Sequence, residues 1–181
     1  YEEPIERAHA PIKGGLLERA SLTLGETVLD LGCGSGALSL DAARLVGPDG
    51  RVIAFDIAEA FISHVRERAN HLPQVMPELG DAQHHDFSEA HCDAVVSLFG
   101  TMFFPDPRAA FANIGKALKV GGRIVFVTWA GPQHNPWFSV PGRAFSEALP
   151  DMPKPDPSAP GPTAFANIEM VTTLLSEAGF E

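Results

Sequence analysis

Asp30 and three closely spaced glycines are the residues whose types and spacing could carry chemistry. Asp30 belongs to a short apolar segment that is followed by Gly32, Gly34 and Gly36. Glycine lets the main chain turn tightly and approach a ligand closely, and the helix expected after the turn would direct its first amides toward that ligand. Asp30 could accept a hydrogen bond from a ligand ammonium group or fix the loop amides. This pattern makes a nucleotide site in an α/β sheet the first hypothesis.

A second carboxylate, Asp56, ends the next apolar segment, 20 residues after Gly36. A carboxylate in that position can accept two hydrogen bonds from the diol of a ribose. Capping of the following helix is the structural alternative for an acidic residue at a strand end. In the context of the glycine turn we expect the ribose role.

Two later segments add candidate contacts. Asp81 could accept a hydrogen bond from an adenine amino group while the amide of Ala82 donates to a ring nitrogen, although turn chemistry also favours Gly-Asp. Ser97, Leu98 and Phe99 end another apolar run, where a reacting group would lie. Phe99 could shape the pocket around the reactive arm of the ligand, and core packing is its alternative.

Strands and helices are expected to alternate along the chain. Apolar runs predict strands at residues 27–31, 51–56, 75–79, 94–98 and 123–129, and helical spacing predicts helices at residues 12–20, 37–46, 58–69, 107–118 and 168–178. This alternation predicts a parallel sheet with helices on both faces. Ligands of such sheets bind beyond the carboxyl ends of the strands, where the acidic and glycine residues fall.

The length of 181 residues fits one domain, residues 1–181. Within it we expect an N-terminal lead-in and helix over residues 1–24. Six prolines between Pro150 and Pro162 exclude regular structure there. We expect that stretch, residues 150–162, to be a covering loop.

Composition narrows the classes of function. The net charge of −10 and the pI near 5.1 disfavour a nucleic-acid partner. We find no apolar run long enough to span a membrane and no metal-ligand spacing among the seven histidines, so we expect no membrane span and no metal. Two cysteines, expected at opposite ends of parallel strands, favour a reducing, cytoplasmic location. The chain is expected to be a monomer or a homodimer.

The ordered motifs resemble those of class I S-adenosylmethionine-dependent methyltransferases, over about residues 25–180. They are V-L-D-L-G-C-G-S-G, V-I-A-F-D-I, G-D-A-Q, F-G-T-M-F-F and A-L-K-V-G-G-R. The closest resemblance is to the small-molecule branch near the ubiquinone/menaquinone biosynthesis type, whose pattern also includes a tryptophan after the fifth strand, here Trp129, and the N-P-W element at residues 135–137.

The resemblance implies a three-layer, Rossmann-like doubly wound sheet, mostly parallel, in strand order 3-2-1-4-5. It implies that the methionine part of S-adenosylmethionine lies at Asp30 and the glycines, the ribose at Asp56, and the adenine beside Ile57 and the G-D-A-Q segment. The implied cofactor-binding residues are Asp30, Gly32, Cys33, Gly34, Ser35, Gly36, Asp56, Ile57, Asp81, Ala82, Gln83, Ser97, Leu98 and Phe99. The product would be S-adenosylhomocysteine.

The implied activity is methyl transfer to an oxygen, carbon or nitrogen atom of a small molecule. No N-P-P-Y or D-P-P-Y, the motif that grips amino groups in other methyltransferases, follows the fourth strand. His134 is a candidate general base if the acceptor must lose a proton, although a lone histidine is more often structural. The catalytic residues are otherwise not indicated.

Two alternatives remain open. A NAD(P)-dependent oxidoreductase shares the G-x-G-x-x-A pattern and Asp56, but Tyr1 is the only tyrosine, so a catalytic Tyr/Lys pair is missing. A non-catalytic module that binds S-adenosylmethionine would keep every motif. The family's final antiparallel pair of strands would follow Gly179-Phe180 and is absent, so we expect a chain truncated at its C-terminus or a shortened relative.

Overall fold

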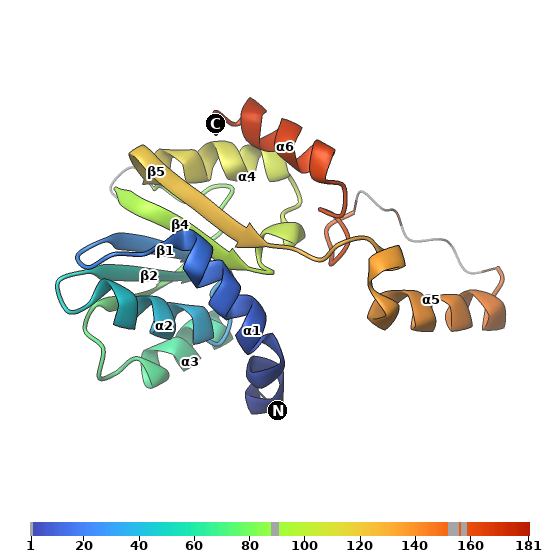
Figure 1. The fold of residues 1–181 in the computed structure, drawn as a ribbon, viewed down its shortest axis with the longest axis horizontal. Helices are drawn as coiled ribbons and strands as arrows, with labels where there is room; N and C mark the ends of the chain where they lie inside the picture. Colours follow the sequence, from blue (N-terminus) through green and yellow to red (C-terminus); the bar gives the residue numbers. More distant parts are fainter. Residues whose placement is uncertain (1, 88–90, 152–155, 157–158) are drawn as a thin grey trace.

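A five-stranded parallel sheet lies at the centre of the computed structural model, which describes residues 2–87, 91–151, 156 and 159–181. The strand order is β3-β2-β1-β4-β5, and every pairing is parallel, which confirms the predicted doubly wound topology (Figure 1). The strands are β1 Thr27–Leu31, β2 Arg51–Asp56, β3 Val75–Leu79, β4 Cys92–Leu98 and β5 Leu118–Val127.

Helices cover both faces of the sheet (Figure 1). Alternate strand residues enter different cores: Val28 packs on the face covered by α1, α2 and α3, and Leu29 on the face covered by α4 and α6. Burial on both faces explains why the central strands are continuously apolar. The helices are α1 Glu2–Ala20, α2 Ala37–Val46, α3 Glu59–Arg68, α4 Pro107–Ile114, α5 Pro136–Ala148 and α6 Ile168–Glu177.

The N-terminal helix is longer than predicted. The sequence indicated a helix only from about residue 12, because Pro11, Gly14 and Gly15 weaken the helical pattern. In the structure α1 runs from Glu2 with Pro11 inside it. Tertiary packing outweighs the weak propensity, since α1 packs against β4, β5 and α2 and buries Leu16.

The segment after α4 also differs from the prediction. The helix expected over residues 107–118 ends at Ile114 and is followed by the short 3₁₀ helix η2, Gly115–Ala117. β5 then begins at Leu118, five residues before the predicted start, with a register shift opposite Cys92 and Ala94. Gly121 and Gly122 therefore lie inside a strand.

The aromatic segment after β5 forms helix α5, whereas the sequence indicated a loop. α5 extends away from the sheet and buries none of its residues (Figure 1). In the described ranges, the 3₁₀ helix η1, Thr101–Phe103, follows β4, and the 3₁₀ helix η3, Pro132–His134, follows β5. Of the predicted covering loop, residues 152–155 and 157–158 lie outside the described residues, and the amide of Gly161 donates to the carbonyl of Met102 in η1 (2.9 Å).

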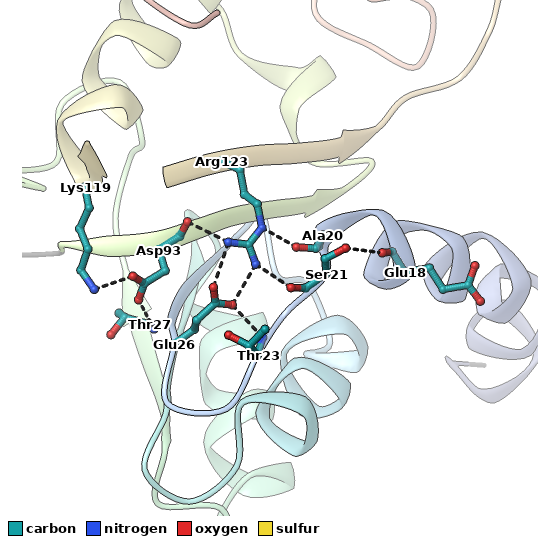
Figure 2. A network of polar contacts seen from close by, with 9 residues as sticks. All are labelled: Glu18, Ala20, Ser21, Thr23, Glu26, Thr27, Asp93, Lys119 and Arg123. Atoms are coloured by element: carbon teal, nitrogen blue, oxygen red, sulfur yellow. Dashed lines mark hydrogen bonds and ion pairs between the residues drawn. The ribbon is translucent and has the colours of Figure 1, made fainter. Parts of the chain in front are cut away.

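Arg123 ties β5 to the segment between α1 and β1 at the amino end of the sheet (Figure 2). Its guanidinium donates to both carboxylate oxygens of Glu26 (3.0 and 2.9 Å) and to the carbonyls of Ala20 and Ser21. The hydrogen bond from Arg123 lowers the pKa of Glu26. These contacts satisfy carbonyls at the C-terminal end of α1. They hold that end of the helix at the amino end of the sheet.

Candidate functional site

Two adjoining cavities lie at the carboxyl ends of the strands. The larger has a volume of about 390 Å³ and the smaller about 160 Å³, and both are lined by Gly32, Gly34 and Leu98. The predicted site residues from β2 and the loop after β3 line the larger cavity, and the glycine turn and α1 line the smaller one. An elongated ligand could therefore span both.

The glycine turn brings β1 and β4 into close backbone contact. Gly32 has φ 69°, and a Cβ atom there would lie 2.9 Å from the Cα of Gly100. The amide of Gly32 also donates to the carbonyl of Phe55 in β2 (2.9 Å). Gly36 caps α2 with φ 85°, packs against Val65 of α3, and lies outside the lining of both cavities. Any side chain at position 32 would force the two strand ends apart.

Asp30 is a buried carboxyl with one unused oxygen. Its side chain is 1% exposed and lines the smaller cavity. Oδ2 accepts a hydrogen bond from Ser39 Oγ (2.5 Å), whereas Oδ1 has no partner among the described residues. Burial and, to a lesser extent, the charge of Asp56 raise the pKa of Asp30 to about 7, against the hydrogen bond from Ser39. Such an oxygen can accept a hydrogen bond from a cationic ligand group.

Asp56 holds the glycine turn against the next helix. Its Oδ2 accepts the amide of Gly34 and its Oδ1 the amide of Ala58, both at 2.9 Å. These bonds fix the turn before α3, whose N-cap residue is Ala58 and not Asp56, so the capping alternative is not observed. Each carboxylate oxygen retains a second acceptor position. Asp56 lines the larger cavity, where Ile57 stands at the rim with 71% of its surface exposed.

The loop after β3 brings Asp81 and Ala82 into the wall of the larger cavity. Asp81 Oδ1 accepts the amide of Gln83 (2.9 Å) in a local turn. Gln83 itself lies outside the lining of both cavities, and its Oε1 accepts the amide of Asp106 (2.6 Å). Asn113 of α4, which the sequence patterns did not indicate, donates to the carbonyl of Ala82 (2.9 Å) and so fixes this loop.

Of the three site residues predicted at the end of β4, one has a structural role and two line the cavities. Ser97 is buried and donates to the carbonyl of Leu31 (2.6 Å), which joins β4 to β1. Leu98 lines both cavities and Phe99 the larger one. Phe99 has φ 67°, an uncommon conformation for a bulky residue, and its ring stacks on Trp129 with centroids 4.7 Å apart. Strain of this kind concentrates at functional sites.

Helix α1 forms the outer wall of the smaller cavity. Ile5, Glu6, His9 and Lys13 all line it, at positions that share one face of a helix. These residues were not predicted, because the first of them were expected in an irregular lead-in. The spacing of polar residues at 6, 9 and 13 is the signal that could have indicated them.

Two ion pairs hold α1 over the glycine turn. Glu6 pairs with Arg68 of α3 (2.5 Å) and accepts the hydroxyl of Ser35 (2.9 Å), and the hydrogen bond from Arg68 lowers the pKa of Glu6. Lys13 pairs with Asp41 of α2 (2.5 Å). The wall of the smaller cavity is thereby fixed to both neighbouring helices.

The remaining predicted residues can be placed directly. Cys33 is buried against the smaller cavity, and its burial raises the pKa of the thiol, which disfavours the reactive thiolate. His134 is exposed in η3 and outside the lining of both cavities. Over the described ranges, no group of three or more His, Cys, Asp or Glu side chains is arranged to hold a metal ion.

Comparison with known proteins identifies the class. Residues 28–122 match the methyltransferase domain family. Aklanonic acid methyltransferase DauC of Streptomyces sp. (strain C5) is 34% identical over 120 residues, which cover 65% of this chain and 54% of that protein. The ubiquinone/menaquinone biosynthesis C-methyltransferase UbiE of Teredinibacter turnerae is 30% identical over 122 residues, 66% of this chain and 49% of that protein.

The solved structures agree on the fold. A SAM-dependent methyltransferase from Aquifex aeolicus superposes with a TM-score of 0.69 at 19% identity, over 92% of this chain and 78% of that one. The chain belongs to the methyltransferase domain family, and its predicted resemblance to S-adenosylmethionine-dependent methyltransferases is confirmed. The chain spans about half the length of the two curated relatives named above. In the part of the chain that the structure describes, no helix is both long and apolar enough to cross a membrane.

Proposed function

We propose that this chain binds S-adenosylmethionine across the two cavities and transfers its methyl group to an oxygen, carbon or nitrogen atom of a small molecule. The observation that carries the proposal is the unpartnered Oδ1 of Asp30 beside the smaller cavity. A buried carboxyl oxygen without a partner is costly to the fold. A ligand ammonium group, such as that of the methionine part, would satisfy it.

The residues around the cavities fit the other parts of the cofactor. Asp56 retains acceptor positions for the ribose hydroxyls at the boundary between the glycine turn and the larger cavity. Phe55 and Phe61 give that cavity apolar walls that suit an adenine ring, and Asp81 and Ala82 border it. These residues, with Gly32, Gly34 and Ile57, would form the cofactor contacts. Gly36, Gln83 and Ser97 would stabilise the surrounding backbone without contacting the cofactor.

When bound, S-adenosylmethionine supplies an electrophilic methyl group on its sulfonium. The task of this chain is then to hold the acceptor in line and to exclude water, which can contribute roughly 7–11 kcal/mol to lowering a barrier. Phe99, stacked on Trp129, gives the junction of the cavities a rigid aromatic wall.

We propose a small-molecule acceptor because the net charge of −10 repels nucleic-acid backbones. By their names, one of the named relatives is a methyltransferase of aklanonic acid and the other a C-methyltransferase of ubiquinone/menaquinone biosynthesis. For this chain we propose the same broad kind of acceptor, a single-domain arrangement of residues 1–181, a monomer or homodimer, and a cytoplasmic location. The position of Cys33 and Cys92 at opposite ends of parallel strands supports the last point.

Calorimetric titration tests the proposal. S-adenosylmethionine, S-adenosylhomocysteine and NAD would be titrated into the chain, into Asp56→Ala and into Asp49→Ala, a control at an exposed turn on the opposite edge of the sheet. We expect both adenosyl ligands to bind the chain and the control, with at least roughly tenfold weaker binding to Asp56→Ala. NAD binding without either adenosyl ligand would support the oxidoreductase instead.

A further inference from the structure

His9 is the histidine of α1 that lines the smaller cavity. Its ring centroid lies 5.1 Å from that of Phe99 and 6.3 Å from that of Trp129. Phe99 lines the larger cavity, and the preceding residue, Leu98, lines both. The imidazole therefore stands where the two cavities meet, although it comes from a helix some 90 residues earlier in the chain.

The position of His9 is held from both sides. Glu6 and Lys13, about one turn before and one turn after it, form the ion pairs that fasten α1 to α3 and α2. Residues three or four positions apart lie on the same helix face, so these pairs turn His9 toward the glycine loop. The aromatic pair formed by Phe99 and Trp129 limits its movement on the side of β4 and β5.

A ligand whose methionine part reaches Asp30 and whose adenosine occupies the larger cavity must place its sulfur between them. Gly32, Gly34 and Leu98, which both cavities share, mark that place. Resting on the function proposed above, we propose that His9 contacts the sulfonium centre of S-adenosylmethionine, and that it does so as the neutral imidazole. His9 is then a catalytic residue in direct contact with the reacting centre.

The reason for the neutral form is electrostatic. Histidine is the side chain that ordinarily changes charge between about pH 5 and pH 8. An imidazolium beside a sulfonium would place two like charges together in a partly buried site, which disfavours binding. S-adenosylhomocysteine carries a neutral sulfur but the same ammonium, carboxylate and adenosine groups. Protonation of His9 should therefore weaken the binding of the methyl donor far more than that of the product.

Other titratable groups face the same place, and their effects on ligand binding must be distinguished from that of His9. They are Glu6 and Lys13 on α1, Cys33 and Asp30 on the opposite wall, and Asp56 at the larger cavity. Asp30 has a pKa raised to about 7 and changes charge in the same range. Because both ligands share the ammonium group that Asp30 would bind, the ratio of their affinities largely cancels its direct effect. Substitution of His9 then shows whether the remaining pH dependence of that ratio comes from His9.

The test measures the affinities of both adenosyl ligands by calorimetry at about pH 8 and about pH 5.5, the range over which histidine titrates. The proteins are the unaltered chain, His9→Gln, His9→Phe and His71→Gln. His9→Phe keeps an aromatic ring beside Phe99 and Trp129, so it serves if His9→Gln disturbs the fold. His71 is an exposed histidine outside both cavities and supplies the matched control.

For the unaltered chain and His71→Gln, we expect the preference for S-adenosylmethionine over S-adenosylhomocysteine to fall roughly tenfold at the lower pH. In the His9 variants the ratio should change less than about twofold. A ratio that responds to pH equally with and without His9 would overturn the inference while leaving the proposed function standing. Failure of both ligands to bind the unaltered chain would instead overturn the proposed function, and this inference with it.

Discussion

Ser39 satisfies only one oxygen of Asp30: its hydroxyl donates to Oδ2 at 2.5 Å, and Oδ1 is left buried without a partner among the described residues. The protein therefore holds a carboxyl in a site that disfavours its charge. That arrangement costs stability in the absence of a ligand. Under the proposed function it would provide a binding contact for the ligand. The same residue thus links the stability of the fold to the proposed function.

Replacing Asp30 with Asn should stabilise the ligand-free protein at alkaline pH. The folded-state pKa of about 7 exceeds the ordinary value of 3.8, so the folded state retains a proton that the unfolded state releases. The contribution of Asp30 to the free energy of unfolding therefore falls as pH rises between these values, by up to about 4 kcal/mol. Asn has no charge and avoids this loss. Urea unfolding should show Asp30→Asn to be more stable at about pH 8 and to have little advantage at about pH 4. A difference in stability between Asp30→Asn and the unaltered chain that is the same at both pH values would contradict the buried charge.

Binding of S-adenosylhomocysteine should strengthen as Asp30 ionises. If the ligand ammonium pairs with the ionised carboxyl, affinity should rise up to roughly thirtyfold between about pH 5.5 and pH 8. S-adenosylhomocysteine is the suitable probe because its sulfur is uncharged and does not respond to the charge of His9. Calorimetry on Asp30→Asn should show weak binding without this rise, and Asp49→Asn should behave as the unaltered chain does. The same rise in Asp30→Asn would assign the pH dependence to another group.

Gly32→Ala should damage both the fold and the site. An Ala at φ 69° is strained, and its Cβ would lie 2.9 Å from the Cα of Gly100. Gly25 has φ 83°, and a Cβ there would meet no atom within 4 Å, so Gly25→Ala isolates the conformational strain. We expect Gly25→Ala to cost about 1 kcal/mol and Gly32→Ala at least about 2 kcal/mol. Thermal unfolding measures the loss of stability in both variants. Equal losses would show that the close approach of the strand ends makes no contribution to the cost of Gly32→Ala.

Arg123→Met should destabilise the amino end of the sheet at neutral pH. The substitution removes the donors to Glu26, Ala20 and Ser21 that Figure 2 shows. Because part of the guanidinium is exposed, we expect a loss of about 1–3 kcal/mol. The exposed pair of Arg66 with Glu59 supplies the control, and Arg66→Met should cost less than about 0.5 kcal/mol.

This loss should depend on pH in a defined direction. Arg123 lowers the pKa of Glu26, so its stabilising effect is present above the ordinary pKa of a glutamate and is lost as pH falls through the lowered value. The difference between the unaltered chain and Arg123→Met should therefore shrink in acid. A difference that stays constant down to about pH 3 would show that the ion pair contributes nothing.

The sheet was predictable because its signals are local. Apolar runs with glycine turns at their ends indicated every strand and, with the family motifs, their order. Even β3, which contains Pro77, was predicted with its observed bounds, Val75–Leu79, and its place at the sheet edge explains why proline is tolerated there. The early start of β5 was missed because Gly121 and Gly122 are turn residues by local rules. β5 pairs with β4 at Leu118 and again from Arg123, and the two glycines lie in the register shift between these pairs.

The outer wall of the site was not predictable in the same way. His9 gains its position from contacts with Phe99 and Trp129, which lie about 90 and 120 residues later. No local pattern encodes such a contact. Conversely, the family resemblance placed Gln83 and Ser97 among the cofactor-binding residues, but their hydrogen bonds direct them to Asp106 and to β1. Whether each of these residues touches a ligand stays a prediction.

A crystal structure of the chain with S-adenosylhomocysteine tests the proposed binding mode most directly. We expect adenine in the larger cavity, ribose hydroxyls on Asp56, and the homocysteine ammonium on Oδ1 of Asp30. We also expect the sulfur beside Gly32 and within contact distance of His9. A ligand bound with its amino acid end outside the smaller cavity, leaving Oδ1 of Asp30 without a partner, would contradict this binding mode.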